Sequence, residues 1–290
     1  MPYFYAVLPP YPMQKIFRVI HLLVLVLIAA PAQAQILNKI FKKPVLTGMY
    51  LQWGYNRDVY SKSTIHFTNG DKYDFKVHDA VAHDQPNFEA FTKTPLDITI
   101  PQNSFRIGFY LNKKHTHAIE INFDHAKYVV DAKQTLRVSG TFQGREIDKD
   151  TLIHPYFMSF EHTNGANFYH VNYVGQHELW RNKKRMHASV IWKAGMGIVV
   201  PRSDVILFEK QTDNQFHVAG YVMGAESGFR FYPLKNLFLE ATVKGGYANY
   251  LDVLTVQGGK ASHAFRYGEV IGLIGYDINF KKKQKPENDK

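Results

Sequence analysis

The chain repeats one pattern, in which every second side chain is apolar over segments of about ten to sixteen residues. The clearest example is segment 186–199, whose alternate positions hold Met186, Ala188, Val190, Trp192, Ala194, Met196 and Ile198. A period of two indicates a β-strand. Strands of soluble sheets average about five or six residues, whereas a tilted strand needs about nine to eleven to cross a bilayer. These strands are therefore long enough to span a membrane.

Eight such strands can be placed along the chain. They cover residues 48–58, 104–112, 117–130, 152–180, 186–199, 216–232, 237–250 and 264–280. The fourth is long, and its apolar parity changes between residues 164 and 167, so we interpret it as one strand with a bulge at Gly165. Eight strands close a barrel whose interior is just filled by side chains. The predicted fold class is all-β, an eight-stranded antiparallel transmembrane β-barrel.

The connections between these strands alternate in length. Residues 112–116, 180–185 and 233–236 are short turns, whereas residues 59–101, 131–151, 201–214 and 252–263 are long. Bacterial membrane barrels have short periplasmic turns and long extracellular loops. Within the long extracellular loop 59–101, segments 63–68 and 72–77 flank Asn69-Gly70, which predicts a hairpin with a type I′ turn.

The chain begins with a candidate export signal. Lys15 and Arg18 precede an apolar run over residues 19–30, and Ala32-Gln33-Ala34 supplies a small-x-small cleavage site. The run is too short for a transmembrane helix. We therefore expect residues 1–34 to be a cleaved signal peptide, with Met13 as the true initiator. Residues 35–280 then form the barrel, and residues 281–290 form a charged periplasmic tail.

Composition narrows the classes of protein further. There is no cysteine, which excludes a diacylated lipoprotein and disulfide-linked loops. Mean hydropathy is −0.28, and no second apolar run is long enough for a membrane helix. An exported chain of this kind fits an outer-membrane barrel with a polar lumen. The formal charge of +10 lies largely in turns such as 182–185 and in the tail, so we do not expect a nucleic-acid partner.

Charged residues occupy the positions that should face the lumen. They are Arg106, Glu120, Asp124, Lys193, Glu226, Arg230, Glu240, Lys244, Glu269 and Asp277. Each buried charge costs several kcal/mol unless it is paired, so we expect an ion-pair network along the barrel axis. Such a network favours a plugged lumen, although a narrow ion-conducting path remains an alternative.

The last strand resembles the C-terminal assembly signal of bacterial outer-membrane proteins. Phe280 follows Ile274, Tyr276 and Ile278 at alternate positions. That signal usually ends the chain, whereas this chain continues through residues 281–290. Over residues 48–280 the chain resembles the small eight-stranded group typified by OmpX and the OmpA membrane domain. The resemblance implies the outer membrane of a Gram-negative bacterium, contact with the outer-membrane assembly machinery and no particular activity.

A second, local resemblance suggests chemistry. The sequence around His162 is similar to the His-x-Ser-Asn motif of the PagL lipid A deacylases, in which a membrane-facing His and Ser with an acidic partner hydrolyse an acyl ester. By parity His162 shares the outward face with Phe160. The resemblance implies His162, Thr163, Asn164 and Glu178 as candidate catalytic residues. The motif departs at the nucleophile, where Asn164 replaces serine, while Thr163 points to the opposite face and Glu178 lies nearly a strand away.

Histidine is abundant enough to suggest metal binding. The closest clusters are His78-Asp79 with His83-Asp84, and His115 with His117. Zinc normally needs three or four protein ligands, so we expect no metal site and no cofactor.

The leading interpretation is a non-enzymatic outer-membrane barrel with a filled lumen and extracellular binding loops. Its expected partners are outer-membrane lipids, lipopolysaccharide and an extracellular ligand that the sequence does not identify. The alternatives are a lipid A or phospholipid acyl hydrolase acting on the outer barrel wall, and a small specific channel.

Overall fold

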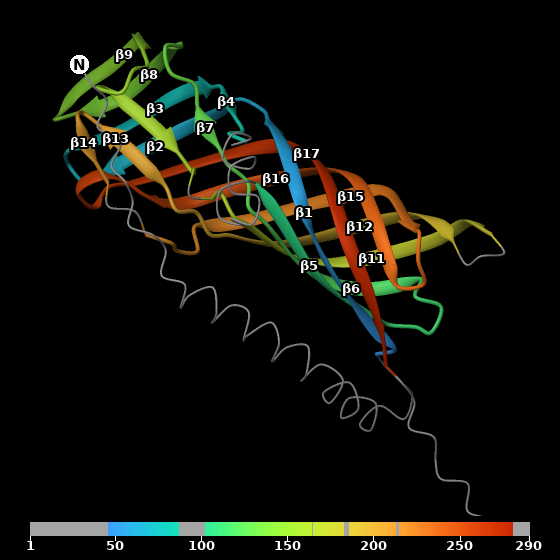
Figure 1. The fold of residues 1–290 in the computed structure, drawn as a ribbon. Helices are drawn as coiled ribbons and strands as arrows, with labels where there is room; N and C mark the ends of the chain where they lie inside the picture. The colour runs from blue at the N-terminus through green and yellow to red at the C-terminus, as the bar shows by residue number, and fades with distance from the viewer. Residues whose placement is uncertain (1–45, 87–101, 164, 183–185, 213–214, 281–290) are drawn as a thin grey trace, which may run out of the picture. The chain divides into compact units, whose positions relative to one another are not determined.

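Eight long strands form a closed antiparallel ring in the computed structural model, which describes residues 46–86, 102–163, 165–182, 186–212 and 215–280. These strands are β1 (Gly48–Tyr60), β5 (Asn103–Tyr110), β6 (His117–Asp124), β11 (Phe168–Arg181), β12 (His187–Val199), β15 (Gly220–Tyr232), β16 (Leu237–Leu254) and β17 (Lys260–Asn279). Each pairs with the next, and β17 pairs with β1 from Gly48↔Asn279 to Tyr60↔Tyr267. The predicted eight-stranded barrel is confirmed (Figure 1).

The fourth predicted strand is wrong in its extent. The barrel strand is β11 alone, whereas the preceding segment β10 (Met158–Glu161) pairs with β13 (Asp204–Leu207). Six residues, not one extra residue, separate β10 from β11. Gly165 and Asn167 in this connection have φ values of +117° and +37°, and such left-handed residues redirect the chain. The segment is thus two strands with different neighbours rather than one bulged strand.

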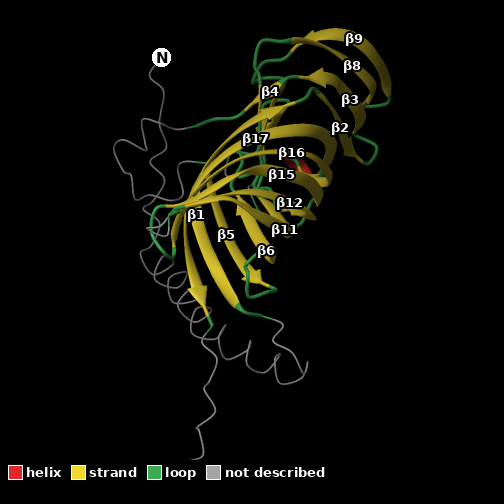
Figure 2. Ribbon diagram, turned by 90° about the vertical axis from the view of Figure 1, so that its right-hand side faces the viewer, coloured by secondary structure: helices red, strands yellow, loops and turns green. Residues whose placement is uncertain are grey.

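The long connections contain additional strands. They are β2 (Ser63–Asn69), β3 (Tyr73–Ala80), β4 (Ala82–His83), β7 (Val129–Val130), β8 (Thr135–Phe142), β9 (Arg145–Leu152), β10, β13 and β14 (Lys210–Gln211), with one 3₁₀ turn at Val256–Gly258. β2 pairs with the start of β17, and β3, β8 and β9 follow in order. We call β2, β3, β8 and β9 the outer sheet. Figure 2 shows it continuing the barrel wall beyond the end of the ring.

The predicted hairpin in the first long loop is present as β2 and β3, but its turn is not type I′. Asn69 pairs with Tyr73, which leaves a turn of three residues, Gly70, Asp71 and Lys72. A type I′ turn needs two consecutive residues with positive φ. Within the turn, Gly70 alone has a positive φ. The predicted loop 131–151 is also largely a hairpin, formed by β8 and β9.

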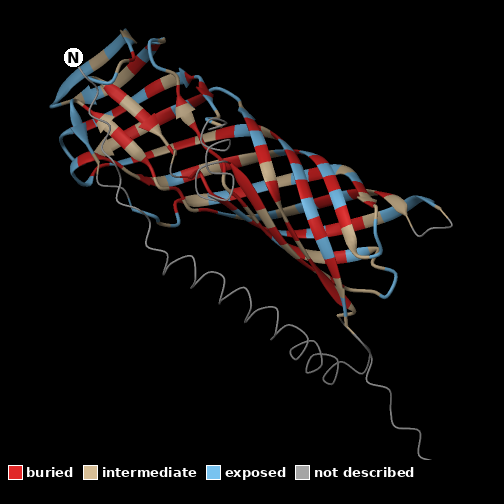
Figure 3. Ribbon diagram, in the orientation of Figure 1, coloured by how far each residue is buried: buried red, intermediate tan, exposed pale blue. Residues whose placement is uncertain are grey.

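Buried and exposed residues alternate along the ring strands (Figure 3). The exposed positions form an apolar outer wall, and charged and polar residues occupy buried positions of the interior. Large apolar side chains are exposed around the wall, among them Val171, Trp192, Met196, Phe229, Val243, Val270, Ile274 and Tyr276. In the ranges described, no helix has the length and apolar composition needed to cross a membrane. The predicted signal peptide (residues 1–34) and tail (residues 281–290) lie outside the described residues.

Several inward aromatic rings fit against glycines on the neighbouring strand. Tyr50 pairs directly with Gly108, and Phe238 with Gly275. A Cβ atom at Gly108 would overlap the Tyr50 ring, so glycine leaves the space that the ring fills. Cross-strand packing of an aromatic side chain over glycine stabilises a curved sheet.

We expect Gly108→Ala to destabilise the barrel by about 1–3 kcal/mol, because the added methyl group forces the Tyr50 ring out of its site. The free energy of unfolding in urea, measured on protein refolded into detergent micelles, tests this. Gly272→Ala is the matched control, since a Cβ there meets no atom within 4 Å. Equal losses in both variants would contradict the packing argument.

Candidate functional site

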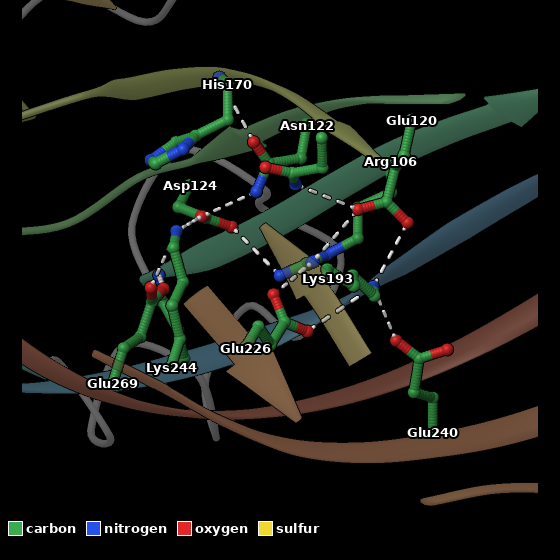
Figure 4. A network of polar contacts seen from close by, with 12 residues as sticks. Arg106, Glu120, Asn122, Asp124, His170, Lys193, Glu226, Glu240, Lys244 and Glu269 are labelled. Carbon is green, nitrogen blue, oxygen red and sulfur yellow. Dashed lines mark hydrogen bonds and ion pairs between the residues drawn. The ribbon is translucent and has the colours of Figure 1, made fainter. Parts of the chain in front are cut away.

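The barrel lumen holds the largest cluster of charged side chains in the described structure, and Arg106 on β5 lies at its centre. The Arg106 guanidinium is fully buried and contacts three carboxylates. Its nitrogens lie 2.8 Å from Glu226, 3.3 Å from Glu120 and 3.5 Å from Asp124. Figure 4 shows these carboxylates around Arg106; Glu120 and Asp124 come from β6 and Glu226 from β15. The contacts neutralise charges that would otherwise be costly to bury.

Lys193 and Arg230 extend the network across the barrel. Lys193 Nζ lies 2.8 Å from Glu240, 3.0 Å from Glu120 and 3.3 Å from Glu226. Arg230 pairs with Glu240 at 2.7 Å. Each carboxylate contacts either two cationic side chains, or one cationic side chain and one polar group. The charges therefore form one connected network rather than isolated pairs.

Lys244 on β16 joins the last two carboxylates of this group. Its Nζ lies 2.6 Å from Asp124 and 3.1 Å from Glu269. Nine of the ten predicted lumen residues are thus in ion pairs. The tenth, Asp277, accepts a hydrogen bond of 2.8 Å from the Tyr110 hydroxyl. All ten are buried.

Further lumen residues that the sequence analysis did not name complete the site, three of them neutral and one, Asp58, acidic. The Tyr50 hydroxyl donates to Glu120 at 2.7 Å, and the Asn56 amide donates to Glu269 at the same distance. The Gln102 amide donates to Asp58 at 2.7 Å. Tyr50, Asn56 and Asp58 lie on the parity opposite to the outward residues of β1, so the alternation could have identified them.

Apolar clusters lie at both ends of the charged network. At the end with short turns, Tyr50, Tyr110, Ala118, Val174, Tyr232 and Phe238 form a cluster that we call the turn-side cluster. His115 stacks on Tyr110 with 3.8 Å between ring centroids. The Arg230 guanidinium lies over the Phe238 ring at 4.2 Å from its centroid, which joins the network to this cluster.

The second apolar cluster fills the end that carries the outer sheet. We call it the outer-side cluster; its buried members include Phe67, Phe75, Tyr128, Phe160, Phe168, Val205, Leu207, Tyr250 and Phe265. These residues come from the outer sheet, from the connections and from the ends of the ring strands. The lumen charges are therefore enclosed between two apolar clusters.

His162 lies inside this outer-side region, and its predicted outward placement is wrong. The side chain is fully buried. Its Nδ1 hydrogen-bonds with the Ser203 hydroxyl at 2.7 Å, and its Nε2 with Nε2 of His263 at 3.1 Å. His162 does share a face with Phe160, as the parity predicted, but that face is buried in the outer-side cluster. The outward assignment failed because β10 pairs with β13 and is not a strand of the ring.

The predicted catalytic set is not assembled. The Thr163 hydroxyl donates to Glu161 at 3.3 Å. Glu178 pairs with Arg181 near the other end of β11, about 30 Å from Phe168 at the rise of a strand. Asn164 lies outside the described residues. Among the described residues, the hydrogen-bonding partners of His162 are a hydroxyl and a second imidazole, and no carboxylate contacts it.

Burial lowers the pKa of His162 to about 3, because the apolar surroundings disfavour the charged imidazolium. His162 is therefore neutral at physiological pH. Its Ser203 partner is 41 residues away in the sequence, and no motif connects the two, so this pair could not be predicted from the sequence.

The histidines considered for metal binding are separated by other contacts. His78 hydrogen-bonds with Ser139 at 2.7 Å, and His83 pairs with Asp131. His117 hydrogen-bonds with the Tyr173 hydroxyl, whereas His115 stacks on Tyr110. Within the described ranges, no group of three or more His, Cys, Asp or Glu residues could hold a metal ion.

Comparison with known proteins identifies solved structures of small outer-membrane barrels at low sequence identity. Neisserial surface protein A (NspA) is 10% identical, with 79% of this chain and 96% of that chain covered and a TM-score of 0.33. Ail of Yersinia pestis, in complex with the heparin analogue sucrose octasulfate, is 11% identical, with 80% and 100% covered and a TM-score of 0.31. The outer-membrane protease OmpT of Escherichia coli is 8% identical, with 81% and 97% covered and a TM-score of 0.35.

No family model matches the chain, and no curated protein matches it. The similarity to solved structures concerns the barrel architecture. These comparisons do not show a resemblance to the PagL deacylases.

We expect Arg106→Met to destabilise the barrel by about 3–5 kcal/mol, because it leaves three buried carboxylates short of a cation. The double variant with Glu226→Gln should lose less than the sum of the two single variants, since the two side chains are in contact. Urea unfolding in micelles measures these differences. Arg137→Met is the control, because Arg137 pairs with Asp148 on the exposed outer sheet and should change stability little. A loss as small as that of the control would contradict the lumen assignment.

We also expect His162 to make stability depend on pH. Its folded pKa of about 3 lies below the unfolded value of about 6.5, so only the unfolded state gains a proton between these values. The contribution of His162 to the free energy of unfolding is therefore fully present above pH 6.5. It is lost as the pH falls towards 3, with a slope of up to about 1.4 kcal/mol per pH unit. Unfolding curves between pH 4 and 8 should show a smaller slope in His162→Gln and the wild-type slope in His78→Gln. An unchanged slope in His162→Gln would refute the assignment.

Proposed function

We propose that this protein is a non-enzymatic barrel of the cell outer membrane, with a lumen that does not conduct and with an outer sheet that serves for binding. An apolar outer wall and a polar interior support the membrane location, because lipid contacts one face of each strand and the lumen contacts the other. Under this proposal residues 1–34 direct export and are removed. Outer-membrane lipids and lipopolysaccharide contact the barrel wall, and the assembly machinery inserts the chain.

The ion-pair network in the lumen is the observation that supports this proposal. Arg106, Lys193, Arg230 and Lys244 are each held by buried carboxylates. An ion passing through would have to displace these charge-assisted contacts, which are the strongest class of hydrogen bond in proteins. It would also have to cross the turn-side cluster and the outer-side cluster, where few polar groups could replace its water shell.

The outer sheet offers the surface most suited to an extracellular ligand. One of its faces packs on the outer-side cluster through residues such as Phe67, Phe75 and Val138. Its last strand, β9, pairs with β8 alone among the described strands, so one edge of β9 is open. Arg145, Glu146, Asp148, Lys149 and Asp150 line this strand, and such charges protect an edge from unspecific pairing. A rigid sheet with a charged edge is suited to selective binding.

Enzymatic hydrolysis on the barrel wall is not part of this proposal. His162 does have a hydroxyl partner in Ser203, but both are buried and away from the exposed wall. A nucleophile and base must reach the substrate ester, and these side chains do not reach lipid.

Planar-bilayer recording tests the closed lumen. We expect no steady current steps from refolded protein, and also none from the double variant Tyr110→Ala with Phe238→Ala, because the ion-pair network and the outer-side cluster remain in it. Insertion is verified by protection of the ring strands from protease and by heat-modifiable migration in electrophoresis. Steady, reproducible steps from the wild-type protein would overturn the proposal in favour of a small channel.

A further inference from the structure

One ladder of lumen charges alternates in sign around the barrel and then stops alternating. Lys193 on β12 is paired in register with Glu226 on β15, which is paired with Lys244 on β16, which is paired with Glu269 on β17. The next position, on β1, holds Asp58. Opposite charges on facing positions stabilise a sheet, and like charges destabilise it. Asp58 thus stands where a positive charge would continue the pattern.

The charges in this part of the lumen do not balance. Four buried cations, Arg106, Lys193, Arg230 and Lys244, are matched by Glu120, Asp124, Glu226 and Glu240. Asp58 and Glu269 remain together on facing positions of β1 and β17, and Glu269 shares Lys244 with Asp124. Both carboxyl groups are at least 95% buried. An uncompensated charge at such a depth is strongly unfavourable, so the pair needs a positive partner.

Unpartnered oxygen atoms surround the same two carboxyl groups. Among the described residues, Asp58 Oδ1, Asn56 Oδ1 and Gln102 Oε1 have no hydrogen-bonding partner, although all three side chains are at least 95% buried. The two amides lie directly against the carboxyl groups: Asn56 Nδ2 is 2.7 Å from Glu269, and Gln102 Nε2 is 2.7 Å from Asp58. The backbone N–H of Asn56 also donates to the main-chain oxygen of Gln102, so the two residues are neighbours.

We propose that Asp58 and Glu269, with the amide oxygens of Asn56 and Gln102, bind one hard divalent cation of the calcium type. All four side chains offer oxygen ligands, and Ca²⁺ binds carboxylate and amide oxygens in flexible sets of six to eight, with water completing the set. Turning each amide about its last side-chain bond exchanges its nitrogen for its oxygen at nearly the same position. The cation then faces two carboxylates and two amide oxygens.

A cation accounts for more of these observations than a proton does. A proton on Asp58 would remove one charge and satisfy one oxygen, but it would leave the two amide oxygens without a donor. A divalent cation restores the alternation of charge between Glu269 and β1 and supplies a positive partner to Asp58 Oδ1. Once both amides have turned and given up their hydrogen bonds to the carboxyl groups, it also contacts the two amide oxygens. Lys244 Nζ lies 3.1 Å from the second oxygen of Glu269. Its positive charge repels a bound metal ion and therefore limits the affinity of the site.

Refolding with and without Ca²⁺ tests the proposal. The protein is refolded into micelles free of lipopolysaccharide, in EDTA or in millimolar Ca²⁺, Mg²⁺ or Na⁺, and the thermal midpoint of unfolding is recorded. Ca²⁺ at ten or more times its dissociation constant should raise the midpoint by about 3–5 °C, because it binds the folded state alone. Mg²⁺ should give a smaller rise, since it requires near-ideal octahedral geometry.

The variants locate the effect. Asp58→Asn and Glu269→Gln should each lose the Ca²⁺ response, and Asp58→Asn should be at least as stable as the wild type in EDTA, because it removes an excess buried charge. Asp277→Asn is the matched control: it is a buried lumen carboxyl about eight residues along β17 from Glu269, and it should keep the response.

Direct binding keeps the test valid if a variant fails to fold. Terbium(III) luminescence, excited through tyrosine, should show one site on the wild-type protein and on Asp277→Asn that Ca²⁺ displaces. No binding to the wild type, or equal Ca²⁺ responses in wild type and Asp58→Asn, would overturn the proposal. A midpoint that rises on acidification in EDTA and ignores Ca²⁺ would likewise overturn it, and would assign a shared proton to the pair instead.

Discussion

Closing eight strands into a ring brings the inward side chains of opposite walls within contact distance, and the structure depends on how their charges are matched. In an open sheet one polar face can remain in water. In this ring, Arg106 on β5 meets carboxylates from β6 and β15, and Lys193 on β12 meets carboxylates from β6, β15 and β16. Three of these strand combinations, β5 with β15 and β12 with β6 and β16, are not neighbours in the sheet, so their contacts brace the ring across its interior. Their strength comes from the same burial that would make any unmatched charge costly.

The apolar clusters at the two ends make this matching possible. Charge-assisted contacts are strong where water is excluded, and the turn-side and outer-side clusters enclose the network from both directions. Arg230 belongs to both environments, since it pairs with Glu240 and also lies over the rings of Tyr50 and Phe238. The interior is thus organised in layers along the barrel, with aromatic side chains, ion pairs and apolar side chains in succession.

The outer sheet and the ring share one apolar interior rather than forming separate modules. Phe67 of β2 and Phe160 of β10 have ring centroids 5.6 Å apart, and Phe160 in turn contacts His263 of β17. The chain of hydrogen bonds from Ser203 through His162 to His263 lies within this apolar surrounding. The polar atoms of these side chains hydrogen-bond with one another, and buried polar groups need such partners. This contact explains why His162 is part of the interior and not of a lipid-facing reaction site.

The sequence by itself determined the fold class, the number of ring strands and ten of the charged lumen residues, although it did not single out Asp58. All three depend on a period of two within single strands, which is a local property of the chain. Alternation does not reveal which neighbour a strand pairs with, so it could not show that β10 leaves the ring and pairs with β13; the predicted fourth strand and the outward placement of His162 were wrong for that reason. Only the tertiary structure decided which charges pair, because partners such as Lys244 and Asp124 are 120 residues apart. It also placed Ser203 beside His162 and Asp58 opposite Glu269, since register and closure of the ring are set by all eight strands together.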